Sequence, residues 1–176
     1  MAIAFELAVN FGSNDAAAHA GHGFVIGAAP LTAGGKTVHL HEPRLHLEQD
    51  VAGAPYLLMT AMPVGVGWGV VADRGHERLP MTAAELTDLG RGLYRMLRRL
   101  HGYRAAQVGW DPESLVDTTE LRRQQADELA AGTIPGLVLA EDVLSDLRGP
   151  GFVSFAPGFV WLPYAGQRPS TLTADE

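Results

Sequence analysis

Residues 82–101 constrain the fold more strongly than any other segment, because they predict a long amphipathic helix. Thr82 and Glu85 have the spacing of a capping box, in which each side chain accepts the backbone N–H of the other residue at the start of a helix. Apolar residues then form one stripe at helical spacing, at positions 86, 89, 93, 96, 97 and 100. Gly102 ends the pattern. Such a stripe has to be buried, so we expect this helix to lie against a sheet.

Alternation of large apolar residues with small or polar ones predicts strands around this helix. The clearest strand is residues 3–11. Residues 55–62 and 64–72 are read as two strands, or as one strand broken near Pro63. Glycines at 65, 67 and 69 leave one face of the second stretch as bare backbone, on which a helix, an aromatic ring or a ligand is expected to pack closely. A further strand is predicted at 103–110, and a hairpin at 152–155 and 159–162.

The order of these elements predicts an α+β fold. We expect a mostly antiparallel sheet with helices on one face, in a ferredoxin-like (split βαβ) order, plus a C-terminal helix and β-hairpin extension. Residues 117–131 favour a peripheral polar helix, and residues 141–147 favour another. A chain of 176 residues with 47% apolar residues can bury a core as one domain. We therefore expect a single globular domain over residues 1–168 and a flexible C-terminal tail over residues 169–176.

Composition excludes several classes of function. The chain has no cysteine, so disulfides, thiolate metal sites and cysteine nucleophiles are ruled out, which fits a cytoplasmic protein. The net charge of −7 argues against general nucleic-acid binding. We find no signal peptide, and the longest apolar run contains Pro63 and is too short to cross a bilayer as a helix, so we expect no membrane partner. Serine-elbow, phosphate-loop and kinase motifs are absent from the sequence.

Three histidines and two acids lie within the ten residues HLHEPRLHLE. If a bulge at Pro43 absorbs a shift in register, His39, His41, His46 and Glu48 share one face of a strand. Imidazole nitrogens about 6 to 7 Å apart along a strand can bind one divalent metal such as zinc. The alternative is that these side chains form the solvated face of an ordinary strand, in which case no cofactor is expected.

Two further groups of residues are candidates for binding. The helix at 82–101 carries a basic face with Arg91, Arg95 and Arg98, and the C-terminal hairpin region supplies the aromatic residues Trp161 and Tyr164. Together they are candidates for contact with a protein partner, and the arginines alone are candidates for binding phosphate.

The acidic residues at 111, 113 and 117 follow a strand and are either a catalytic or cation-binding group or an ordinary turn and helix cap.

Two functional hypotheses follow. The first is a small acidic non-catalytic binding protein that acts on a protein partner, basic in character, in an immunity, inhibitor or accessory role. Its motivation is the absence of a catalytic motif together with the acid-rich C-terminal third, which has four basic and eleven acidic residues from position 111 onward. Bacterial immunity proteins share this size and charge as a class, without a shared motif. The alternative is a metal-dependent enzyme or metal-binding domain at His39, His41 and His46. A homodimer is compatible with either.

Overall fold

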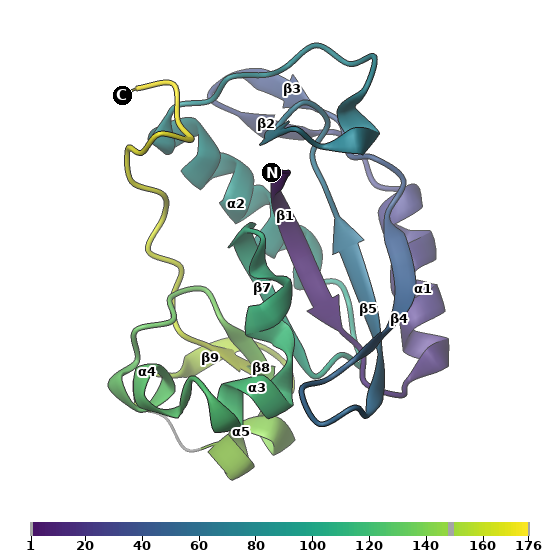
Figure 1. The fold of residues 1–176 in the computed structure, drawn as a ribbon, viewed down its shortest axis with the longest axis vertical. Coiled ribbons are helices and arrows are strands. Elements are labelled where there is room, and N and C mark those ends of the chain that lie inside the picture. Colours follow the sequence, from purple (N-terminus) through teal and green to yellow (C-terminus); the bar gives the residue numbers. More distant parts are fainter. Residues whose placement is uncertain (1, 148–149, 176) are drawn as a thin grey trace.

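The computed structural model describes residues 2–147 and 150–175. Its helices and strands are labelled in Figure 1. In chain order the elements are β1 (Ile3–Asn10), α1 (Asp15–Ile26), β2 (Leu31–Ala33), β3 (Lys36–Val38), β4 (Arg44–Gln49), β5 (Pro55–Ala61), β6 (Gly67–Trp68), the 3-10 helix η1 (Val71–Asp73), α2 (Ala83–Leu97), β7 (Ala105–Trp110), the 3-10 helix η2 (Pro112–Val116), α3 (Thr118–Arg123), α4 (Ala126–Ala131), β8 (Val138–Ala140), α5 (Glu141–Leu147), β9 (Val153–Ala156) and β10 (Phe159–Trp161).

One eight-stranded sheet organises the molecule. Its strand order is β4-β5-β1-β7-β8-β10-β9, with β6 paired to the beginning of β1. Every pairing between these strands is antiparallel in the part of the chain that the structure describes. The expected α+β class with a mostly antiparallel sheet is therefore confirmed. The ferredoxin-like order is not confirmed, because the separate β2–β3 hairpin and strand β6 interrupt it and the sheet continues beyond β7 through three further strands.

The odd-numbered side chains of β1 face the main hydrophobic core. Phe5, Leu7 and Val9 are fully buried there with the apolar stripe of α2 and the inner side of α1. Figure 1 shows both helices behind the sheet. The predicted helix is confirmed as α2, and both hydrogen bonds of the Thr82–Glu85 capping box are present. The alternation in β1 and the stripe in α2 thus meet as the sequence predicts.

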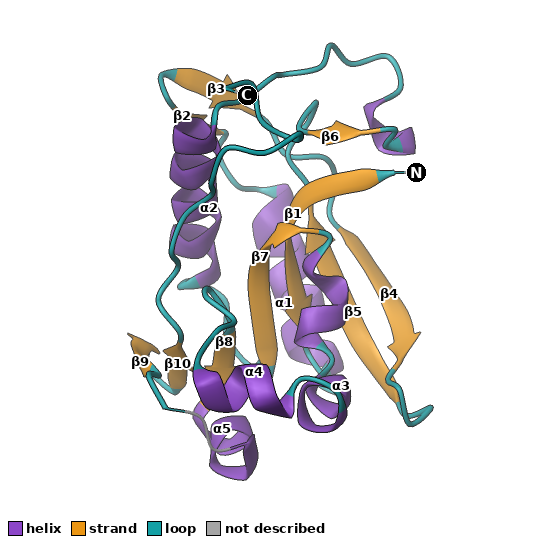
Figure 2. Ribbon diagram, turned by 60° about the vertical axis from the view of Figure 1, so that its left-hand side comes forward, coloured by secondary structure: helices purple, strands orange, loops and turns teal. Residues whose placement is uncertain are grey.

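The opposite face of the sheet is covered only at one end. Ala8, Leu58 and Leu139 form a second apolar cluster there with residues of η2, α3, α4 and α5. Figure 2 shows α3 and α4 on the side of the sheet away from α2. The expectation that helices cover one face alone was therefore wrong. The reason is that this face is apolar around Leu58 and Leu139 and needs cover there. Polar side chains follow it, with Thr60 and Gln107 beside Ala8 and Glu6 beyond them.

A loop of the chain packs closely on the glycine-rich stretch. The loop from η1 to α2 passes over Gly65, where an added Cβ would lie 2.6 Å from the backbone oxygen of Glu77. The backbone N–H of Leu79 also donates to the carbonyl oxygen of Gly65 at 2.9 Å. Gly65 has a φ of +75°, which favours glycine for a second reason. Its neighbours form only the two-residue strand β6.

The end of the chain runs back along α2. Gly90 is in direct contact with the Tyr164 ring, and the backbone N–H of Gln167 donates to Thr87 Oγ1 at 2.8 Å. Residues 169–175 belong to the segment that the sequence predicts to be a flexible tail. In the structure the backbone N–H of Ala174 donates to the carbonyl oxygen of Met81 at 2.8 Å, and the Asp175 carboxylate accepts from the N–H of Ala83. Among the described helices, none is long and apolar enough to cross a membrane.

Candidate ligand-binding site

The four residues of the predicted metal strand do not lie on one strand. Strand β3 ends at Val38 and pairs with β2, and β4 begins at Arg44 and pairs with β5, so His39 and His41 lie in the connection between them. His46 and Glu48 share one face of β4, where His46 Nε2 lies 3.0 Å from Glu48 Oε1. The bulged strand that would have aligned all four side chains on one face is therefore not formed.

His41 turns instead toward the loop after β6. Its Nε2 lies 2.6 Å from Asp73 Oδ1, and its ring meets the ring of His76 edge to face at 5.4 Å. Asp73 Oδ1 also accepts the backbone N–H of Gly65, so this contact closes a turn. Among the described residues, no group of three or more histidine or acidic side chains is arranged to hold a metal ion.

The residues suggested for protein contact do meet at one place. Arg91, Arg95, Arg98, Trp161 and Tyr164 line a single cavity of about 220 Å³ together with Tyr94. Arg98 is partly committed to structure, because it donates to the carbonyl oxygen of Phe155 and lies 4.4 Å over the Phe155 ring. Arg91 lies 3.5 Å from Asp88. Helical spacing of the arginines and the return of the chain along α2 bring the group together, and its role in protein contact stays a prediction.

The acidic residues after β7 divide between structure and surface. Asp117 caps α3 by accepting the N–H groups of Thr119 and Glu120, and it also accepts the N–H of Val51. Its interpretation as a helix cap is confirmed. Asp111 and Glu113 lie at the start of η2, and Asp111 has a φ of +44°, a rare conformation for a residue other than glycine.

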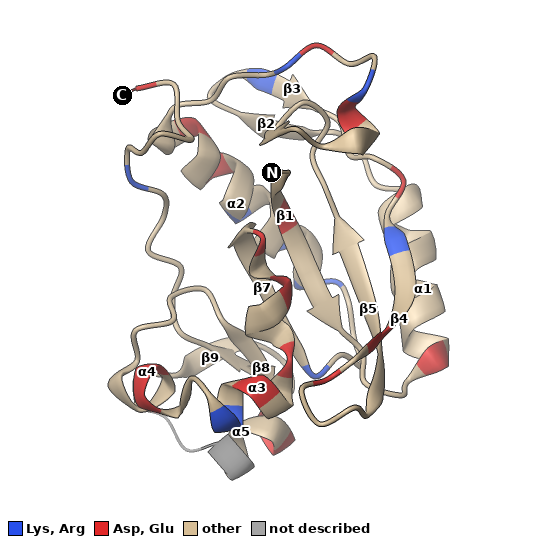
Figure 3. Ribbon diagram, viewed as in Figure 1, with Lys and Arg blue, Asp and Glu red and all other residues tan. Residues whose placement is uncertain are grey.

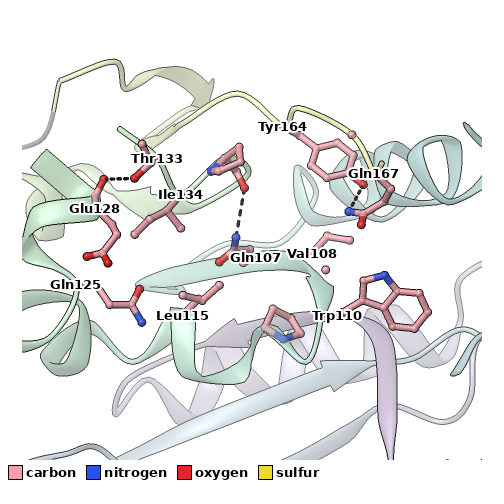
Figure 4. A pocket seen from close by; sticks show the side chains of 14 residues that line it. Gln107, Val108, Trp110, Leu115, Gln125, Glu128, Thr133, Ile134, Tyr164 and Gln167 are labelled. Carbon is pink, nitrogen blue, oxygen red and sulfur yellow. Dashed lines mark hydrogen bonds between the residues drawn. The ribbon is translucent and has the colours of Figure 1, made fainter. Parts of the chain in front are cut away.

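A larger pocket opens between β7, η2, α4 and the returning C-terminal segment (Figure 4). Its volume is about 510 Å³, within the range usual for ligand sites. The lining mixes apolar side chains with a few polar ones. Gln107 lies in the middle, Glu128 and Gln125 lie toward one end, and Trp110 and Tyr164 lie toward the other. The remaining side chains of the wall include Val108, Leu115, Thr133, Ile134, Pro135 and Gln167.

Gln107 is the unusual residue of this pocket. It is only 6% exposed, and its amide Nε2 donates to the carbonyl oxygen of Pro135 at 3.3 Å. The carbonyl of Pro135 can only accept, which fixes the orientation of the amide. Gln107 Oε1 therefore points elsewhere, and it has no hydrogen-bond partner among the described residues. An unpaired buried acceptor costs about 1–3 kcal/mol. A ligand that donates an N–H or O–H to Oε1 would remove this cost.

Other groups in the pocket can also contact a ligand. Tyr164 Oη accepts from Gln167 Nε2 at 3.0 Å, which leaves its own O–H available as a donor. Burial raises the pKa of Tyr164, so its hydroxyl stays protonated at neutral pH. The Thr133 hydroxyl donates to the backbone oxygen of Glu128 at 3.1 Å, and the Glu128 carboxylate is left exposed at the pocket edge. The pocket thus offers one unfilled acceptor, one carboxylate and two aromatic rings.

Comparison of the chain with protein-family models, curated proteins and solved structures finds no match. The function has to be inferred from the site itself.

Sequence patterns did not single out Gln107. One local signal exists, because Gln107 is the only polar side chain in the strand AAQVGW. Polar residues at such positions are usually hydrogen-bonded, so the sequence could not show that half of its amide would lack a partner. The loop that brings Pro135 to it lies 28 residues further along the chain.

Proposed function

We propose that this chain is a non-catalytic binding protein that acts on a protein partner, and that the Gln107 pocket takes an arginine side chain from a basic segment of that partner. The observation that carries the proposal is Gln107 Oε1, a buried acceptor that has no donor among the described residues and belongs to a residue lining the pocket. A guanidinium group has five N–H donors and no acceptor, so it suits an acceptor of this kind.

The shape and chemistry of the pocket also support an arginine side chain as its ligand. A guanidinium that donates to Gln107 Oε1 has the Glu128 carboxylate available toward one end of the pocket. Toward the other end, Trp110 and Tyr164 provide ring faces on which the planar cation or its aliphatic chain can lie. The cavity is larger than one side chain, so residues that flank the arginine also fit.

Charge supports a basic partner. Residues 111–128 contain six acidic and two basic residues, and this segment forms η2, α3 and α4 beside the pocket. Figure 3 shows the acidic positions on α3, on α4 and on the segment that joins α3 to β7. The whole chain carries −7, so a basic segment would be attracted before it docks. The pocket would provide specificity for arginine. The acidic surface would increase the rate of association.

The test uses N-acetyl-arginine amide and a five-residue peptide with arginine at its centre, titrated into ¹⁵N-labelled protein. We expect shifts of the Gln107 side-chain amide and the Trp110 indole N–H, and binding at least fivefold tighter than for the citrulline analogues, which have the same shape without charge. A peptide that binds more tightly than the free amide supports a protein partner, and equal binding overturns that part of the proposal.

Variants locate the binding. Gln107→Leu removes the acceptor and should weaken binding of the peptide at least fivefold. Gln124→Leu is the matched control, because Gln124 is exposed at the end of α3 and does not line the pocket. Unchanged binding by Gln107→Leu, or an equal loss in both variants, contradicts the assignment of the pocket.

A further inference from the structure

A second cavity lies on the same face of the sheet and shares no lining residue with the Gln107 pocket. It has a volume of about 530 Å³. The chain start at residues 2–4 and the segment at 70–72 supply apolar walls. Four charged side chains complete the lining: Glu6 of β1, Arg44 of β4, and Asp111 and Glu113 at the start of η2.

Glu6 is 4% exposed, and its carboxylate forms no hydrogen bond or ion pair with any residue in the described ranges. Buried carboxylates are almost always paired, because an isolated charge is costly to bury. The Glu6 side chain lines the second cavity.

The surrounding charges have opposite signs in different parts of the cavity. Asp111 precedes η2 and Glu113 lies in it, while Arg44 lies across the sheet on β4. Asp111 Oδ1 accepts the backbone N–H of Ala4 at 2.8 Å, which holds this carboxylate at the cavity. The Arg44 guanidinium is exposed, and within the described part of the chain it makes no ion pair with Glu6 or another carboxylate. A cationic group and an anionic group of one ligand can each find a partner here.

We propose that this cavity binds a small aliphatic zwitterion, an α-amino acid of the leucine or valine type. Glu6, with Asp111 and Glu113 nearby, accepts the ammonium group, and Arg44 binds the carboxylate through paired N–H donors. The aliphatic side chain packs against Ile3, Val70 and Val71. A bare metal ion fits less well, because Arg44 repels it and the described acidic residues are not arranged for coordination.

Proton release is a consequence of this arrangement. Burial, and next the charge of Glu113, raise the pKa of Glu6 from 4.5 to about 7, with a smaller contribution from Asp111 and an opposing one from Arg44. Near neutral pH, part of the protein population therefore holds a proton on Glu6. An ammonium ligand favours the ionised carboxylate, so its binding should expel that proton.

The test is calorimetric titration with L-leucine, with 4-methylpentanoate, which has the leucine skeleton without the ammonium group, and with isopentylamine, which lacks the carboxylate. We expect leucine to bind at least tenfold more tightly than either analogue, and to release protons at pH 6.5 when measured in buffers of different ionisation enthalpy. Failure of leucine to bind, or equal binding by an analogue, overturns the proposal.

Two variants act on the two ends of the ligand. Glu6→Gln and Arg44→Met should each weaken leucine binding at least tenfold, whereas Arg123→Met, an exposed arginine outside the cavity, should leave it unchanged. Arg44 is exposed, so its variant tests the proposal even if a change at Glu6 perturbs folding. Gln107→Leu should leave leucine binding intact, which separates this site from the arginine pocket. Normal leucine binding by Arg44→Met contradicts the assignment.

Discussion

At the scale of single residues, two buried tyrosines differ in one respect that experiment can isolate. The Tyr94 hydroxyl donates to the carbonyl oxygen of Gly136 at 2.8 Å and accepts the N–H of Val108 at 3.1 Å. The Tyr103 hydroxyl is buried without a partner among the described residues, while its ring stacks on Phe159 at 4.0 Å. The same hydroxyl group is thus fully used in one tyrosine and unused in the other.

Replacement of each tyrosine by phenylalanine should therefore have different effects on stability. Tyr94→Phe leaves a buried N–H and a buried carbonyl unpaired, and should lower the free energy of unfolding by about 1–3 kcal/mol. Tyr103→Phe removes an unsatisfied group and should be neutral or slightly stabilising. Urea unfolding followed by circular dichroism measures both. Equal losses in the two variants would contradict the hydrogen-bond assignments.

At the scale of elements, the start of α2 is joined to strand β3. Glu85 N–H donates to Thr82 Oγ1 at 3.2 Å, and Glu85 Oε2 accepts from Thr82 N–H at 2.9 Å. The same carboxylate oxygen lies 2.8 Å from Lys36 Nζ of β3. These bonds lower the pKa of Glu85, the Lys36 hydrogen bond being the largest cause. The helix cap thus also fixes the β2–β3 hairpin at the N-terminal end of α2.

Loss of this cap should destabilise the whole protein. Thr82→Ala removes the side-chain acceptor and should lower the free energy of unfolding by about 1 kcal/mol. Thr82→Ser keeps the hydroxyl and should stay within a few tenths of a kcal/mol of the original chain. Chemical unfolding of the two variants in parallel provides the check. A serine variant as unstable as the alanine variant would show that the methyl group, rather than the cap, matters.

At the scale of the whole molecule, the buried Glu6 links stability to pH. Its pKa is raised from 4.5 to about 7 in the folded chain. Between these values the folded chain holds a proton that the unfolded chain has released. This contribution to stability is fully present below pH 4.5 and is lost as the pH rises through 7. The loss amounts to on the order of 3 kcal/mol at most.

Glu6→Gln should remove this pH dependence. Relative to the original chain, the variant should gain in stability as the pH rises from 4.5 to 8, with most of the gain below pH 7.5. Unfolding free energies at several pH values measure it, and Glu77→Gln, at an exposed loop position, serves as the control. A constant difference between variant and original chain across this range would show that Glu6 titrates normally in the folded state.

Local patterns predicted the elements well and the sites poorly. The stripe of α2, its cap and the alternation in β1 depend on residues a few positions apart, and all three are present in the structure. The histidine strand failed because strand pairing decides register, and β3 and β4 pair with different partners. The arginine and aromatic group was suggested from charge and composition, and only the path of the chain along α2 places it around one cavity.

The sequence by itself determined the α+β class, the main helix and which side of β1 enters the core, because periodicity and capping are local properties of the chain. Tertiary structure alone decided which polar groups lack partners. The one hydrogen bond of the Gln107 amide in the described structure goes to a carbonyl 28 residues away. Glu6 lines the same cavity as Arg44 and as acidic residues more than 100 positions further along the chain. Burial and pairing are properties of the assembled sheet, so contacts distant in sequence create both proposed sites.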